Sequence, residues 1–254
     1  MDARRLNAVL RWMQHTPKKL WFRKLANYPD SLVLLADSAF KADKDTGLSV
    51  RGMLAFRCCR AQLGVEGSAS TRVHECTKTG DIEGHLIEWV SKTQRHVTRA
   101  TFASELYGGT DALDQGKLLQ LSLHELHSGS GSLEELRRLT TQGELKVALI
   151  LVLDAMSVVA AIAAPTIKTP AENGLLVHLK WMREQLDTNQ LWCLCWVDTR
   201  SMAADGLTKG AVDRQALHDL LDDHWKLSQP LKVWRSPLAA RSDRSEHNSR
   251  SSRG

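Results

Sequence analysis

The chain has 254 residues, of which 43% are hydrophobic and 25% charged, a composition that excludes a wholly disordered protein and suffices for one sizeable core. Its formal net charge of +5 is concentrated at the two ends, since residues 1–30 carry seven basic and two acidic side chains and residues 232–254 carry six and two. The part between the ends is therefore net acidic, which favours a cation-binding core with basic flanks for a polyanion.

The cysteines and the N-terminus bear on where the protein resides. The five cysteines form no CxxC pair and no His/Cys zinc spacing, which favours a reduced intracellular protein, in either the cytoplasm or the nucleus. The first residues lack the apolar core and the small-residue cleavage site of a secretion signal. We therefore expect the protein not to be secreted.

The first stretch predicts a short helix and two strands. Apolar residues recur at helical spacing over residues 6–14, and Pro17 ends the pattern. Residues 31–36, SLVLLA, form an apolar run of strand length that ends on Asp37. Residues 48–59 predict a second strand.

The next stretch leads into a long helix. Residues 60–84, rich in Gly, Ser and Thr, predict an exposed excursion, and residues 85–91 predict a third strand that completes an antiparallel meander. Either Thr98 or Thr101 is then expected to cap a helix that reaches Leu126.

Helices and strands alternate from there on. Ser132 begins a capping box, which predicts a short surface helix to about Thr141. Residues 145–153 predict a fourth strand, nearly continuous in apolar residues, that ends on Asp154 and leads into a helix of small residues. The apolar run over 147–164 is long enough to raise a membrane span, but Asp154 at its centre would be costly in a bilayer, so we expect no membrane association.

The last third of the chain predicts an amphipathic helix over 172–186 and a fifth strand over 191–197, followed by a helical segment that contains Asp205. Residues 211–235 predict a helical C-terminal extension. Residues 236–254 predict a disordered Ser/Arg tail, since they have too little apolar surface to fold.

Together these elements predict an α/β fold over residues 31–210, with a five-stranded mixed sheet in which three antiparallel strands are followed by alternating helices and strands. If the first and fourth strands are parallel neighbours, Asp37 and Asp154 lie side by side at their ends. Glu105, on the long helix, and Asp205 then approach from either side. Four carboxylates so placed repel one another unless divalent cations lie between them, which favours two Mg²⁺ ions about 4 Å apart, as in a two-metal phosphodiester hydrolase.

Short motifs surround these acids. Glu105 is preceded by a Trp, a Ser-Lys pair, a Gln and a Val. Asp205 lies in the motif Ala-Asp-x-Leu-Thr-Lys, and Asp154 is followed by a Ser. In this order, over residues 6–210, the motifs resemble the ribonuclease H domain of copia-type (Pseudoviridae-like) retrotransposon Pol polyproteins. The residues that carry the resemblance are Val9-Leu10-Arg11, Thr16, Asp37, Trp89, Ser91, Lys92, Gln94, Val97, Glu105, Asp154, Ser157 and Ala204 to Lys209.

The resemblance implies a ribonuclease H-like fold and an endonuclease that cuts the RNA strand of an RNA/DNA hybrid, giving 5′-phosphate and 3′-hydroxyl ends. It implies that Asp37, Glu105, Asp154 and Asp205 hold two Mg²⁺ ions, for which Mn²⁺ can substitute. It also implies that residues 1–30 are a remnant of the connection to an upstream reverse transcriptase domain. That domain is absent from the chain, because no Tyr-x-Asp-Asp motif occurs.

Two departures from the family pattern support an alternative. Ala155 stands where the family commonly has Asn, and residues 60–84 replace a tight turn. The alternative is a catalytically inactive remnant that acts as a nucleic-acid-binding or structural domain. A retroviral-type integrase is disfavoured, because its glutamate follows the second aspartate, whereas Glu105 precedes Asp154.

Three basic residues lie between the third predicted strand and the acid of the long helix. Lys92, Arg95 and Arg99 are the candidates for contacts with nucleic-acid phosphates. A solvated basic turn explains the same residues equally well.

Overall fold

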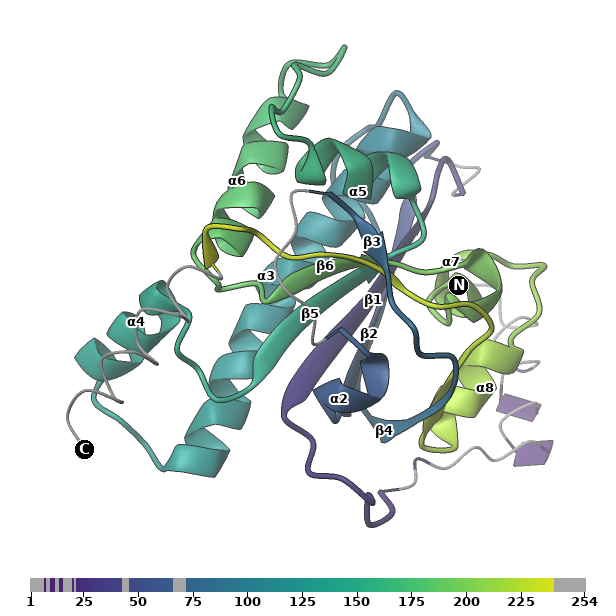
Figure 1. The fold of residues 1–254 in the computed structure, drawn as a ribbon. Coiled ribbons are helices and arrows are strands. Elements are labelled where there is room, and N and C mark those ends of the chain that lie inside the picture. Colours follow the sequence, from purple (N-terminus) through teal and green to yellow (C-terminus); the bar gives the residue numbers. More distant parts are fainter. Residues whose placement is uncertain are drawn as a thin grey trace, which may run out of the picture.

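The sheet has more strands than the sequence predicts. The computed structural model describes residues 22–42, 46–65 and 72–239, together with isolated positions before residue 22. In these residues eight strands form one mixed sheet, in the order β3-β8-β6-β5-β1-β2-β4-β7. Figure 1 labels the strands β1 to β6. The α/β class is thus confirmed, and the expected number of five strands is wrong. The predicted helix over 6–14 lies outside the described ranges.

The five predicted strands occupy neighbouring places in the middle of this sheet. β1 pairs antiparallel with β2, and β2 pairs antiparallel with β4, which confirms the meander. β1 pairs in parallel with β5, and β5 pairs in parallel with β6. These strands are β1 (Ser31–Ala39), β2 (Val50–Cys58), β4 (Gly80–Thr93), β5 (Ala148–Leu153) and β6 (Cys193–Trp196).

Three short strands extend both edges. β8 (Lys232–Trp234) pairs antiparallel with β6, and β3 (His74–Glu75) pairs with β8. At the other edge β7 (His224–Leu227) pairs with the first residues of β4. β3, β7 and β8 have two to four residues, and unlike β6 none of them lies in a longer continuous apolar run that a sequence pattern would reveal.

The extra strands correct two expectations. The segment 211–235 is helical only in α8 (Gln215–Leu221), and it then supplies β7 and β8. The excursion 60–84 holds α2 (Arg60–Leu63), β3 and the first residues of β4, and Leu63, Val65 and Cys76 are buried in the core, so its described residues do not form an exposed loop.

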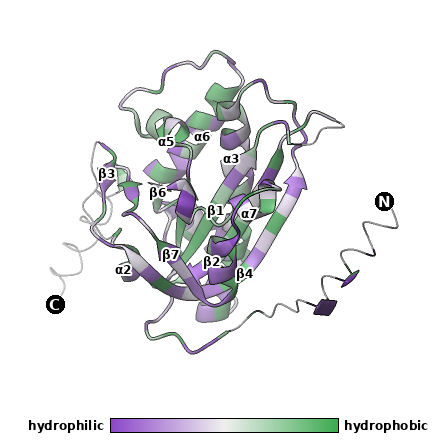
Figure 2. Cartoon of the chain, turned by 90° about the vertical axis from the view of Figure 1, so that its right-hand side faces the viewer, coloured by the Kyte–Doolittle hydropathy of each residue, from purple (hydrophilic) through white to green (hydrophobic). Residues whose placement is uncertain are grey.

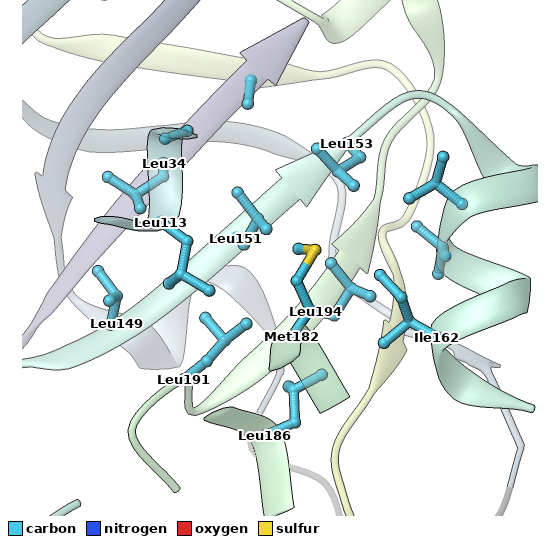
Figure 3. Packing of buried hydrophobic residues seen from close by; sticks show 14 of the residues in the cluster. Leu34, Leu113, Leu149, Leu151, Leu153, Ile162, Met182, Leu186, Leu191 and Leu194 are labelled. Carbon is cyan, nitrogen blue, oxygen red and sulfur yellow. The ribbon is translucent and has the colours of Figure 1, made fainter. Parts of the chain in front are cut away.

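One face of the sheet is covered by α3 (Thr101–Ser128), α5 (Met156–Ala163) and α6 (Leu175–Asp187), which lie together on one side in Figure 1. Gly116 lets α3 approach β1 closely, since a Cβ there would lie 2.2 Å from the Leu34 side chain. Figure 3 shows the apolar layer between sheet and helices, with labelled side chains that include Leu34, Leu113, Leu149, Leu151, Leu153, Ile162, Met182 and Leu194.

Local helix signals were partly correct. Ser132 caps α4 (Leu133–Gln142), because its side chain accepts a hydrogen bond from the backbone N–H of Glu135, as the capping box predicts. The cap expected at Thr98 or Thr101 is wrong: Ala100 precedes α3 and makes no side-chain cap. Thr98 is buried and its hydroxyl lies 2.9 Å from that of Ser49 instead.

The opposite face is covered by α2, α8, the short helix α7 (Asp205–Thr208) and the 3₁₀ helix η1 (Thr199–Ser201). The fully buried Trp225 of β7 packs here, and its indole N–H donates to the Ser201 carbonyl at 2.8 Å. Figure 2 shows hydrophilic and hydrophobic segments along β4, which lies near an edge of the sheet. Residues 236–239 continue the fold, with Ser236 buried, so the predicted disordered tail does not begin at 236.

The run over 147–164 folds as β5 followed by α5, as expected. In the described part of the chain, no helix has the length and apolar character that a membrane crossing requires.

Candidate metal centre

Asp37 and Asp154 lie at the same end of two adjacent strands. The parallel pairing of β1 with β5 ends at Ala36 opposite Leu153, so the next residue on each strand is an aspartate. Parallel strands place their carboxyl ends on one edge of the sheet, where open α/β sheets carry their sites. The structure thus confirms that these two acids lie side by side.

Glu105 completes a group of three carboxylates. It projects from the second turn of α3 and is 7% exposed, and Asp37 is 1% exposed. One carboxylate oxygen each from Asp37, Glu105 and Asp154 lies within 4.8 Å of the others. Three acids far apart in the sequence therefore converge on one point, and this triad can hold a metal ion.

Asp205 belongs to the same site but reaches it through a lysine. It begins α7, and its Oδ1 lies 2.6 Å from the Nζ of Lys209, which also lies 3.2 Å from Oδ1 of Asp37. The Thr208 hydroxyl donates a hydrogen bond to Oδ2 of Asp37. The structure thus brings all four predicted acids to one end of the sheet, three of them directly and the fourth by way of Lys209.

Sequence reasoning did not assign Thr208 and Lys209 to the site. Both stand in the motif that surrounds Asp205, so a signal was present. Their side chains donate hydrogen bonds to Asp37, which lies 171 and 172 positions away in the sequence. No local pattern reveals such a contact.

Gly52 allows α7 to approach the site. It lies opposite Asp37 in the β1–β2 pairing. A Cβ at this position would lie 2.7 Å from Cγ2 of Thr208 and 3.1 Å from the Ala204 carbonyl oxygen. Any side chain here therefore forces α7, and with it Asp205, away from the strands.

A buried hydrogen-bond network connects the residues that adjoin two of the acids. The Gln94 side-chain amide donates to the Ser38 hydroxyl at 2.7 Å and to the Ser104 carbonyl at 2.8 Å, and the two serine hydroxyls lie 2.7 Å apart. Ser38 follows Asp37, and Ser104 precedes Glu105. Gln94 therefore holds the end of β1 against the start of α3.

The electrostatics show a site with too little positive charge. Burial, then the charges of Asp37 and Asp154, raise the pKa of Glu105 to about 9. Burial also raises the pKa of Asp205 to about 7, although the hydrogen bond from Lys209 opposes the rise. Burial followed by the charge of Asp37 raises the pKa of Asp154. Protons are therefore taken up where a cation would otherwise balance the charge.

The residues present fit a hard divalent cation. All donors of the triad are carboxylate oxygens, which are ligands that Mg²⁺, Mn²⁺ and Ca²⁺ prefer. Cys193 and Cys195 are buried in the cluster on the α7 face and are not members of the group. The chemistry of the donors thus excludes a thiolate-type zinc or iron–sulfur site at this position.

The three candidate phosphate-binding residues lie beside this site along the chain. Lys92 is near the end of β4, and Arg95 and Arg99 lie in the connection between β4 and α3. All three are exposed, and none forms an ion pair with another described residue. Trp89, also on β4, is 53% exposed. This surface is open to a polyanion, and it is equally the surface of a solvated basic turn.

Four acids from β1, α3, the end of β5 and α7 thus meet beside a lysine, a threonine and a glutamine-centred network. The site is at the carboxyl ends of the two central parallel strands. Comparisons of this chain with protein-family models, with curated proteins and with solved structures give no match.

Proposed function

We propose that this chain is a metal-dependent endonuclease of the ribonuclease H type, which derives from the Pol polyprotein of a copia-type retrotransposon and hydrolyses the RNA strand of an RNA/DNA hybrid. The observation that carries the proposal is the convergence of Asp37, Glu105 and Asp154 to within 4.8 Å at the ends of β1 and β5. The proposal is also supported by the order of the central strands. β1, β2 and β4 are antiparallel neighbours, and β5 and β6 run parallel to β1, as expected for the ribonuclease H-like fold that the motifs imply.

In this proposal Asp37, Glu105, Asp154 and Asp205 hold two Mg²⁺ ions, with Mn²⁺ as a substitute. Bound Mg²⁺ supplies Lewis acidity, which favours deprotonation of the attacking water and stabilises the leaving 3′ oxygen. Thr208 and the Gln94 network orient the ligands, since they hold Asp37 and the start of α3 in place.

The substrate is recognised by shape and charge. Lys92, Arg95 and Arg99 contact the phosphates in a manner independent of base sequence. Selection of a hybrid over duplex DNA rests on its A-form-like groove and on contacts with the RNA 2′-hydroxyls.

A cleavage assay tests the proposal. Purified protein is incubated with a labelled RNA/DNA hybrid and Mg²⁺, beside the variants Asp37→Asn and Glu105→Gln. We expect the wild type to release 5′-phosphate products and each variant to be at least about 100-fold slower, because loss of a direct ligand costs more than loss of a residue that supports one. Equal rates for wild type and variants, or no cleavage at all, would rule out the enzyme.

A second function is favoured by one observation. Lys209 already pairs with two of the four acids, so the cluster has a charge partner even without a metal. An inactive domain that binds nucleic acid through Lys92, Arg95 and Arg99 fits this arrangement. Gel retardation with an RNA/DNA hybrid tests this alternative. It is supported if a protein without cleavage activity retards the hybrid at low salt and does so less as the salt concentration rises, and it is contradicted if there is no retardation at low salt.

A further inference from the structure

The ammonium group of Lys209 lies between two acids of the proposed metal centre. Its Nζ is 2.6 Å from Oδ1 of Asp205 and 3.2 Å from Oδ1 of Asp37. The Asp37 side chain is 0% exposed and that of Asp205 is 10% exposed, while the Lys209 side chain is 33% exposed. The lysine thus enters the site from the solvent side and places its charge between two buried carboxylates.

The four acids therefore divide into two groups that share Asp37. Asp37, Glu105 and Asp154 converge directly on one point. Asp37 and Asp205 are instead bridged by Lys209. One group is short of positive charge, and the other already contains a cation.

A divalent ion and the Lys209 ammonium group cannot both lie between Asp37 and Asp205. A second Mg²⁺ between Asp37 and Asp205 would need oxygen ligands at about 2.1 Å from the same two carboxylates to which Lys209 donates. Two cations on the same pair of carboxylates repel each other strongly in a site of low exposure.

We propose that Lys209 takes the place of the second divalent cation in the resting protein, so that the protein binds one divalent ion, at Asp37, Glu105 and Asp154, and binds a second only when Lys209 leaves. This inference rests on the metal centre of the proposed function and changes the number of ions that it holds at rest. Lys209 is able to leave, since it follows the last turn of the four-residue helix α7 and its side chain is one-third exposed.

The number of bound ions tests this inference without reference to cleavage. Mn²⁺ is counted by equilibrium dialysis and by the loss of the free-ion signal in electron paramagnetic resonance. We expect one ion per chain in the wild type and two in Lys209→Met. Lys209→Arg keeps the charge and stays at one ion, and Lys226→Met, which removes an exposed lysine on β7, also stays at one.

Each outcome separates this inference from the function on which it rests. Two ions in the wild type, or one ion in Lys209→Met, overturn the role of Lys209 and leave the metal centre standing. No bound ion in either protein overturns both. Lys209→Gln, which can still donate to Asp205, is the second variant in case the methionine variant fails to fold, and it is likewise expected to bind two ions; one ion in it contradicts the inference.

Discussion

Glu105 lies buried beside Asp37 and Asp154, and its side chain has no hydrogen-bond partner among the described residues. Burial and the two neighbouring charges raise its pKa from 4.5 to about 9. A carboxyl group in this state is neutral at pH 7, and it must lose its proton before it can bind a metal ion. Metal binding and proton release are therefore coupled at this residue.

The pKa of Glu105 predicts how stability varies with pH in the metal-free protein. Between pH 4.5 and about 9 the folded state keeps a proton that the unfolded chain has lost, so the free energy of unfolding falls as the pH rises. In the presence of a chelator we expect the free energy of unfolding to fall by up to about 1 kcal/mol per pH unit across this interval. Tm should decrease with it. Thermal unfolding at a series of pH values measures this.

The matched variant for this prediction is Glu105→Gln, which mimics the neutral carboxyl group. Its stability should depend less on pH than that of the wild type, with the remaining slope due mainly to Asp205, whose pKa of about 7 acts in the same direction. A pH dependence as steep in the variant as in the wild type would contradict the assignment to Glu105.

Removal of the Gln94 side chain should lower both the stability of the protein and its affinity for a metal ion. Gln94→Ala removes the hydrogen bonds to Ser38 and Ser104, which should cost about 1–3 kcal/mol and let Asp37 and Glu105 move apart. The control is Gln120→Ala, at a position on α3 away from the acids, which removes a buried hydrogen bond from the Gln120 side chain to the Val147 carbonyl. Denaturant unfolding should show a loss in both variants, and Mn²⁺ titration a loss in Gln94→Ala alone. Equal Mn²⁺ affinities would show that Gln94 is only structural.

At the scale of elements, close backbone approaches set the distances between the ligands. α3 lies against β1 because Gly116 leaves room for Leu34, and α7 lies against β2 because Gly52 leaves room for Thr208. α3 carries Glu105, and α7 carries Asp205. The two glycines thus determine how near these acids come to the strand-end aspartates.

Gly52→Ala should disturb the α7 side of the site. The new Cβ meets Thr208 and the Ala204 backbone, and relief of this overlap should cost about 1–3 kcal/mol. Gly210→Ala is the control, since a Cβ there meets no described atom within 4 Å. Urea unfolding of the two variants compares them, and equal stabilities would mean that α7 gives way freely.

At the scale of the whole molecule, the C-terminal segment adds one strand on each side of the five central strands. β7 and β8 both come from residues 224–234, yet β7 pairs with β4 and β8 pairs with β6, on opposite sides of the central strands. Trp225 and Trp234 are fully buried. The segment expected to be an appended helix is therefore part of the core.

A pair of tryptophan variants tests this integration. Trp225→Ala should lower the free energy of unfolding by about 3–5 kcal/mol, because it leaves a cavity and removes the hydrogen bond to Ser201. Trp89→Ala, at a position 53% exposed, should cost about 0.5 kcal/mol or less. Chemical denaturation measures both, and a small loss in Trp225→Ala would mean that β7 folds apart from the core.

The sequence by itself determined the central strands, the α/β class, and the places of Asp37 and Asp154 directly after two apolar strands, whereas the adjacency of those strands came from the structure. Apolar runs and strand-end acids are local patterns, and local patterns suffice for such features. The tertiary structure alone decided the three short strands, the position of α7 over Gly52, and the insertion of Lys209 between Asp37 and Asp205. These depend on contacts between residues far apart in the chain, where packing space and charge balance outweigh local preference.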